Sequence, residues 1–245
     1  MRRAGYARAQ TGRLTFALIL APYGVTSRTV QAELLDSLPH DHPDALDNRR
    51  DLRLINTIMG NHRWLARTLR AHRGSGRSAL EIGAGTGELA RRLWRRHWRA
   101  DGLDLCPAPG DWPAEAHWHR ADLRTFDGFD TYEVVYGNLI FHQFSTSELR
   151  AVGSRIQRHA RLLLACEPAR HWRWQQLFRL LAPLIGANHV SRHDAAVSIA
   201  AGFRGEELPR LLGLDPQRWT WRCTTTALGA YHLTAWIRGT NPIPE

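Results

Sequence analysis

The first long stretch with the hydrophobic periodicity of a helix begins at Asp47. Between Asp47 and His72, apolar residues recur at the three- and four-residue spacing of an amphipathic helix, with arginines between them. Gly60 interrupts this run, and a glycine-serine-glycine sequence at 74–76 follows it. We therefore expect a helix over 47–72 that can break at Gly60. Its repeating apolar positions are Leu52, Ile55, Met59, Leu65 and Leu69.

Short apolar runs then alternate with helical segments. A run of this kind that is bounded by turn residues is typical of a buried strand, and strands alternating with helices predict a parallel sheet covered on both faces. Ser145 and Glu148 have the spacing of a capping box at the start of a helix. The predicted strands are 78–82, 102–105, 117–122, 132–141 and 161–168, and the helices between them are 88–97 and 145–160.

The last third of the chain has a different pattern. Residues 171–185 form an apolar and aromatic helical stretch, and Ser191 with Asp194 resembles a second capping box, opening a helix that runs to about Ala201. Two β-rich runs at 218–238 meet at a glycine turn, which predicts an antiparallel hairpin. The aromatic helix can be a lid over an apolar ligand or ordinary core.

Composition narrows the class of protein. The 245 residues, 43% hydrophobic and 23% charged, suit one main globular domain. Three widely spaced cysteines favour a reducing cytoplasm, and no run of apolar residues is long enough to span a membrane. All 33 basic residues are arginine, and the absence of lysine indicates codon bias. This weakens the argument from the net charge of +10 for nucleic acid as a partner, although a basic surface would still attract polyanions. We expect residues 1–29 to be a poorly ordered extension.

A glycine-rich loop follows the first predicted strand, in ALEIGAGTGELARRL at 79–93. Glycine lets a ligand approach the backbone at the start of a helix. A dinucleotide fingerprint would need glycine where this chain has Glu88, and no Gly-Lys-Ser/Thr of a phosphate-binding loop is present. Glu81 can attract an ammonium group, and Asp104 at the end of the second strand can bind ribose hydroxyls. S-adenosylmethionine carries both groups.

Together with these two acidic residues, EIGAGTG at 81–87 resembles motif I of the class I S-adenosylmethionine-dependent methyltransferases. The resemblance to the family covers residues 78 to about 168. The resemblance implies a Rossmann-like, doubly wound α/β fold with a mostly parallel seven-stranded sheet and an antiparallel C-terminal hairpin. It also implies a helical N-terminal cap at 30–76, a cofactor-binding domain at 77–245 and a helical acceptor-side insertion at 169–215. The implied cofactor-binding residues are Glu81, Gly83, Ala84, Gly85, Gly87, Asp104, Leu105, Asp122, Leu123 and Asn138.

The acceptor side should follow the fourth strand, where NLIFHQF begins at Asn138. The segment lacks the N-P-P-Y type tetrad of amino-methylating nucleic-acid enzymes and the cysteine of pyrimidine carbon methylation, and no carboxylates cluster for a catalytic metal. It resembles the NLFLHHF-type segment of quinone- and phenol-methylating enzymes. His142 is then the candidate base, although a packing role is equally open.

Three further segments resemble small bacterial methyltransferases of polyketide or phenolic-lipid pathways: RRDLRLINTIMGN at 49–61, ACEPAR at 165–170 and NHVSRHDAAVSIAAGF at 188–203. That resemblance places Glu167, His193, Asp194 and Arg204 at the acceptor. Asp194 is equally well explained as a helix cap, and Glu167 can simply end a strand. We therefore expect S-adenosylmethionine-dependent, metal-free O- or C-methylation of a small aromatic or polyketide-derived molecule. An RNA methyltransferase and a non-catalytic cofactor-binding module remain as alternatives, and the oligomeric state stays open.

Overall fold

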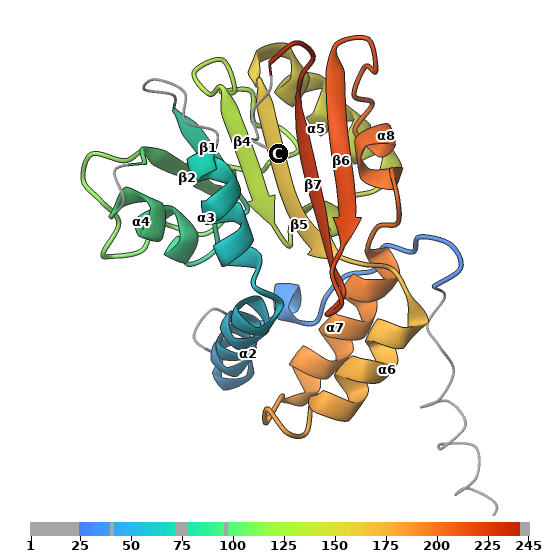
Figure 1. Cartoon of the computed structure of the whole chain (residues 1–245). Helices are drawn as coiled ribbons and strands as arrows, with labels where there is room; N and C mark the ends of the chain where they lie inside the picture. The colour runs from blue at the N-terminus through green and yellow to red at the C-terminus, as the bar shows by residue number, and fades with distance from the viewer. Residues whose placement is uncertain (1–24, 40–41, 72–77, 96–97, 241–245) are drawn as a thin grey trace, which may run out of the picture.

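The architecture is a seven-stranded sheet with helices on both faces (Figure 1). The computed structural model describes residues 25–39, 42–71, 78–95 and 98–240. The strand order is β3-β2-β1-β4-β5-β7-β6. The strands are β1 (Ala79–Ile82), β2 (Ala100–Asp104), β3 (Trp118–Arg120), β4 (Val134–Asn138), β5 (Leu162–Pro168), β6 (Trp219–Thr225) and β7 (Ala230–Ile237).

The strand directions confirm the predicted doubly wound sheet. β1 pairs in parallel with β2 on one side and with β4 on the other, so the chain winds outward in both directions from β1. β7 runs antiparallel to β5 and to β6, which forms the predicted C-terminal hairpin. The order reverses between β1 and β4, and open α/β sheets bind ligands at the carboxyl ends of strands flanking such a point.

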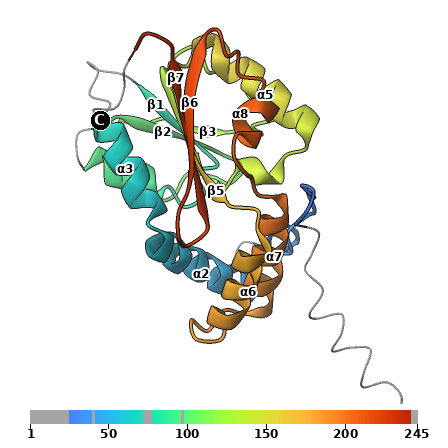
Figure 2. The same cartoon turned by 45° about the vertical axis from the view of Figure 1, so that its right-hand side comes forward.

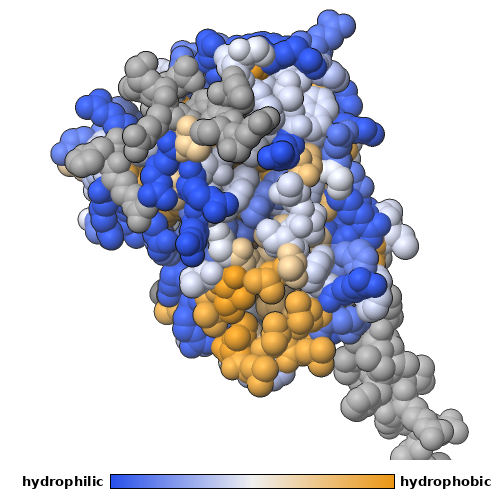
Figure 3. Space-filling view, in the orientation of Figure 1, coloured by the Kyte–Doolittle hydropathy of each residue, from blue (hydrophilic) through white to orange (hydrophobic). Residues whose placement is uncertain are grey.

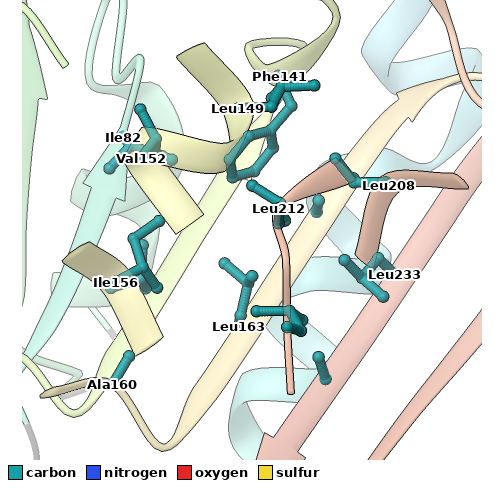
Figure 4. Packing of buried hydrophobic residues seen from close by; sticks show 14 of the residues in the cluster. Ile82, Phe141, Leu149, Val152, Ile156, Ala160, Leu163, Leu208, Leu212 and Leu233 are labelled. Atoms are coloured by element: carbon teal, nitrogen blue, oxygen red, sulfur yellow. The ribbon is translucent and has the colours of Figure 1, made fainter. Parts of the chain in front are cut away.

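Each face of the sheet has its own layer of helices (Figure 2). Helices α3 (Asn61–Ala71) and α4 (Glu88–Trp94) lie on one face, and α5 (Thr146–His159) and α8 (Glu207–Leu211) lie on the other. Side chains alternate between the two faces along a strand, so Leu162 and Leu164 pack towards α3 while Leu163 packs towards α5 and α8. Figure 4 shows Leu163 facing Ile156 and Leu212.

A third group of helices lies beyond the carboxyl ends of the parallel strands (Figure 1). It consists of α2 (Pro43–Met59), α6 (Trp172–Leu181) and α7 (His189–Ala201), and α7 contacts both α2 and α6. Residues 25–38, which include the short 3-10 helix η1 (Leu35–Ser37), run beside them. This segment is named the N-terminal strap below. These elements form the roof over the ligand-binding edge of the sheet.

Local signals predicted some helix ends correctly and one incorrectly. Gly60, with φ of 72°, separates α2 from α3 as expected, and Ser145 with Glu148 forms the predicted capping box of α5. The predicted cap at Ser191 was wrong, because Asn188 caps α7 by accepting the N–H of Ser191. Asp194 lies inside α7 and instead accepts backbone N–H groups of the strap.

The predicted N-terminal extension is only partly described. Residues 1–24 lie outside the described residues. Residues 25–29 differ from the expectation, because Val25 is 7% exposed and Thr29 donates its N–H to the carbonyl of Ala200. Arg28 donates to the carbonyls of Ala201, His142 and Phe144, at 2.8, 2.9 and 2.6 Å. These bonds fix this part of the strap against the body of the domain.

The predicted N-terminal cap at 30–76 and the predicted acceptor-side insertion at 169–215 each contribute helices both to the roof and to the packing against the sheet. Within 30–76, α2 lies in the roof, whereas α3 packs on the sheet through Leu65 and Leu69. Within 169–215, α6 and α7 lie in the roof, whereas Leu208 and Leu212, in α8 and just beyond it, belong to the core under the sheet. No helix among the described residues has the length and apolar character needed to cross a membrane.

Candidate active site

The glycine loop turns sharply between β1 and α4. Gly83, Gly85 and Gly87 have φ of 63°, 55° and 65°, a left-handed conformation that side-chain-bearing residues rarely adopt. A Cβ on Gly83 would lie 2.7 Å from Ile140, and one on Gly87 would lie 2.6 Å from Trp112. A Cβ on Gly85 would meet nothing within 4 Å. Gly85 therefore presents bare backbone to open space beside the loop.

Glu81 carries a buried carboxyl group at the end of β1. Its side chain is nearly enclosed, and its Oε2 accepts the N–H of Ala90 at 2.9 Å and the hydroxyl of Tyr136 at 3.4 Å. Burial raises the pKa of Glu81 to about 8, although both hydrogen bonds act in the opposite direction. The group is therefore largely protonated at neutral pH until a cation lies next to it.

Asp104, at the end of β2, is tied to the glycine loop. Its Oδ2 accepts the N–H of Gly85 at 2.7 Å, and its Oδ1 accepts the N–H of Cys106 at 2.9 Å. Each carboxylate oxygen keeps a further lone pair for a ligand hydroxyl. Ala84, Gly85, Asp104 and Leu105 line the same cavity, and Leu105 is 63% exposed.

Three further predicted cofactor residues lie along the same edge. Asp122 pairs with Arg124 at 3.3 Å, while Leu123 is buried in the core. Asn138, at the end of β4, donates its amide N–H to Asn56 of α2 at 3.0 Å. Its Oδ1 is enclosed and has no hydrogen-bond partner among the described residues.

A large cavity joins these residues to the roof. Its volume is about 970 Å³, near the upper end of roughly 300–1,000 Å³ that small-molecule sites occupy. Nine of the ten predicted cofactor residues line it, and Gly87 does not. The far part of the cavity is mostly apolar and lies between α2, α6, α7 and the strap. Among the residues that line this part are Leu35, Leu52, Ile55, Phe178, Leu181 and Ile199.

His142 lines the cavity, but its ring nitrogens are both occupied. Nδ1 lies 2.7 Å from Glu167 Oε2, and Nε2 lies 3.3 Å from Glu33 Oε1. Burial lowers the pKa of His142, but the hydrogen bonds and charges of the two carboxylates outweigh it and raise the value to about 9. The predicted base is thus protonated at neutral pH and has no free nitrogen, so the geometry argues against that role.

Three of the four predicted acceptor residues, all except Asp194, do not line the cavity. Glu167 is fully buried and accepts the backbone N–H groups of residues 140–142, so it shapes the segment after β4. His193 turns its Nδ1 to Asp194 at 3.0 Å. Arg204 donates to the carbonyls of Arg170 and Val25 and holds the start of the strap. The described contacts of these three side chains are within the protein, so their predicted place at the acceptor stays a prediction.

The roof supplies site residues that motif reading did not find. Glu33 and Asp36 of the strap line the cavity, as do Asn48 and Asn56 of α2. Leu139, directly after β4, is the non-glycine residue with positive φ, 58°, among those described, and it also lines the cavity. Strained backbone of this kind tends to occur at functional sites. Glu33, Asp36 and Asn48 belong to no segment singled out from the sequence, so only their placement in the fold reveals them.

The fold can be compared with known proteins. No protein-family model matches the sequence, and no curated protein matches it either. The solved plantazolicin methyltransferase BpumL in complex with SAH aligns with a TM-score of 0.65 at 10% identity, covering 83% of this chain and 92% of that chain. This chain has a methyltransferase fold. The plantazolicin methyltransferase BamL, with a triazolic desmethylPZN analog and SAH, aligns with a TM-score of 0.62 at 11% identity, over 83% and 92% of the two chains.

Proposed function

We propose that the protein is an S-adenosylmethionine-dependent methyltransferase acting on a small, largely apolar molecule. One observation carries the proposal: a single cavity joins the glycine loop and its acids to an apolar chamber under the roof. The cofactor end has the residues that this ligand needs, and the chamber has room for a second molecule. The shared fold with methyltransferases supports the same assignment.

The residues at the cofactor end fit S-adenosylmethionine. The open space at Gly85 admits a ligand against the backbone, and Asn138 lines the same cavity. Glu81 would face the ammonium group of the methionine part, and Asp104 would receive the ribose hydroxyls. Asp122 and Leu123 would lie beside the adenine.

When bound, the cofactor supplies a methyl group on a positively charged sulfur. The chain contributes alignment and exclusion of water, because charge is dissipated as the methyl moves to the acceptor. Ile140, in the segment after β4, packs against Gly83 of the glycine loop. The described residues contain no group of three or more His, Cys, Asp or Glu side chains arranged to hold a metal ion. We propose metal-free transfer.

The apolar chamber favours a small molecule over RNA. Figure 3 shows an apolar area at its lower end, in the region of α2 and α6. The exposed apolar side chains of these two helices and of the residues just after α6 include Leu54, Ile58, Leu180, Leu181 and Leu184. The tryptophans near the arginine-rich helix, Trp94 and Trp98, pack against the core instead of offering a stacking surface for bases. The apolar lining of the chamber suits a largely apolar acceptor.

Calorimetric titration with SAH tests the cofactor end of this proposal. We expect the wild-type protein to bind SAH, and Asp104→Asn to weaken binding by at least about tenfold through loss of a charge-assisted hydrogen bond. The matched control is Asp130→Asn, at an exposed position away from the cavity, which should bind like the wild type. Failure of the wild type to bind SAH would refute the proposed function.

A further inference from the structure

The strap brings the carboxylate of Glu33 to the cavity, and one of its oxygens has no hydrogen-bond partner among the residues that the structure describes. Glu33 Oε1 accepts the hydroxyl of Ser198 and lies 3.3 Å from His142 Nε2. Oε2 makes no hydrogen bond to the described residues, and it is not among the enclosed side-chain atoms that lack a partner. Because Glu33 lines the cavity, this oxygen is open to a ligand.

Glu33 is held in place by a chain of charges. Glu167, from β5, fixes the ring of His142, and protonated His142 fixes Oε1 of Glu33. Ser198 adds a second anchor from α7. The side chain is 13% exposed, so its rotamer is constrained by packing as well as by hydrogen bonds. A carboxylate fixed at one oxygen presents the other in a defined direction, as orientation of a reacting group requires.

The surrounding wall offers more hydrogen-bond acceptors. Asn48 of α2 lines the same cavity, is 2% exposed, and has an Oδ1 without a partner. Burial, together with the nearby charges of Glu33 and Asp194, raises the pKa of Asp36. Arg49 and Arg53 of α2 also line this wall; Arg53 is exposed, so its charge is screened, whereas Arg49 is half-buried. The acceptor oxygens of the strap and α2 favour a ligand that donates hydrogen bonds over one that only accepts them.

We propose, on the basis of the methyltransferase function above, that Glu33 receives the O–H or N–H of the acceptor through Oε2. The acceptor is then an alcohol, phenol or amine with an apolar body. The lone pair of its oxygen or nitrogen forms the bond to the methyl carbon, and the electron pair of the S–C bond stays on sulfur. The proton passes from the heteroatom to Glu33 and then to water. His142 and Glu167 are positioning residues for this carboxylate.

Three probes with the same apolar body test the preference. The SAH-saturated protein is titrated with 1-octanol, n-octylamine and octanoate. We expect the alcohol and the amine each to bind at least about tenfold more tightly than octanoate, a difference of about 1.4 kcal/mol. The net charge of +10 alone would favour octanoate, so the expected order is specific to the cavity.

The variant Glu33→Gln tests whether this residue sets the order. We expect this substitution to reduce the preference for 1-octanol and n-octylamine over octanoate by about fivefold or more without changing the affinity for SAH. Glu115→Gln is the control, because it removes the same negative charge at an exposed position outside the cavity. Equal or tighter binding of octanoate by the wild type would overturn the proposal, as would an unchanged order in a folded Glu33→Gln protein.

The two proposals fail in different ways. A wild-type protein that does not bind SAH contradicts the proposed methyltransferase function. A protein that binds SAH but prefers octanoate contradicts only the role of Glu33. If Glu33→Gln does not fold, which its melting curve would reveal, the probe order of the wild type alone decides the proposal.

Discussion

At the scale of single residues, the site combines a buried acid that holds a proton with a buried histidine that is charged. Glu81 has a pKa raised to about 8 by burial. His142 has a pKa of about 9, since two carboxylates outweigh the effect of burial. Both values reverse the protonation state that the same residue would have in water at pH 7. Each therefore predicts a measurable dependence on pH.

The first prediction concerns Glu81 and the cofactor. An ammonium group beside Glu81 favours its ionised form, so binding at neutral pH requires the carboxyl to release a proton. SAH affinity should then rise with pH below about 8, by up to about tenfold per pH unit. Titrations at pH 7 in two buffers of different ionisation enthalpy measure the released proton. Glu81→Gln should bind more weakly and lose this release; an affinity of the wild type that is constant from pH 6 to 8 would contradict the role of Glu81.

The second prediction concerns His142 and stability. Its folded pKa lies above the unfolded value of about 6.5, so its stabilising contribution is complete below that pH. The contribution is lost progressively as pH rises towards and through about 9. His142→Gln should lower the free energy of unfolding by about 3–5 kcal/mol at pH 6, because two buried carboxylates lose their partner.

Urea denaturation between pH 6 and pH 10 measures this effect. The difference between wild type and His142→Gln should shrink as pH rises, whereas His159→Gln, at an exposed helix end, should match the wild type throughout. A difference that does not change with pH would show that His142 is neutral in the folded protein.

At the scale of elements, the strand-glycine-helix unit was predictable because its signals are local. Periodicity located the strands and most helices, and the spacing of Ser145 and Glu148 located a helix start. The roles of Glu33 and Asp194 were not predictable from spacing. Glu33 meets His142 across 109 positions, and Asp194 meets the strap across 160. An acidic residue can be a helix cap, a surface charge or a ligand contact. Contacts with residues far away in the sequence decide which of these roles it has.

The third prediction distinguishes two effects of a substitution in the glycine loop: loss of stability through backbone strain, and loss of SAH affinity through contact with the ligand. Gly85 and Gly205 have φ of 55° and 46°, and a Cβ on either would meet nothing within 4 Å. Alanine at each position should therefore cost a similar 1–2 kcal/mol of stability. Only Gly85→Ala should weaken SAH binding, by more than about tenfold, because its methyl group would point into the ligand space. Equal SAH affinity of the two variants would contradict the placement of the cofactor.

At the scale of the whole molecule, the fold separates two tasks along one cavity. The sheet edge and glycine loop provide the polar end, while α2, α6, α7 and the strap provide the apolar chamber. The strap is anchored by Arg28 and Glu33, so the chamber wall depends on a segment far from the glycine loop in sequence. We expect acceptor binding to be driven by apolar burial and to vary little with salt.

The fourth prediction follows from this division. Leu181, at the edge of the chamber, is 39% exposed and lines the cavity. Leu181→Asp should weaken 1-octanol binding by about tenfold, because it places a charge where the probe needs an apolar wall. SAH affinity should not change. Exposed Leu46 of α2, which is outside the cavity lining, gives the control variant Leu46→Asp. Equal losses of octanol affinity in both variants would contradict the chamber.

The most direct test of the central claim is transfer of a labelled methyl group. The purified protein and methyl-labelled S-adenosylmethionine are added to an extract of the source cells, which is then divided into an organic phase and an acid precipitate. We predict label in the organic phase, lost with Asp104→Asn and retained with Asp130→Asn. Ribonuclease-sensitive label in the precipitate, with none in the organic phase, would contradict this prediction and point to RNA as the acceptor.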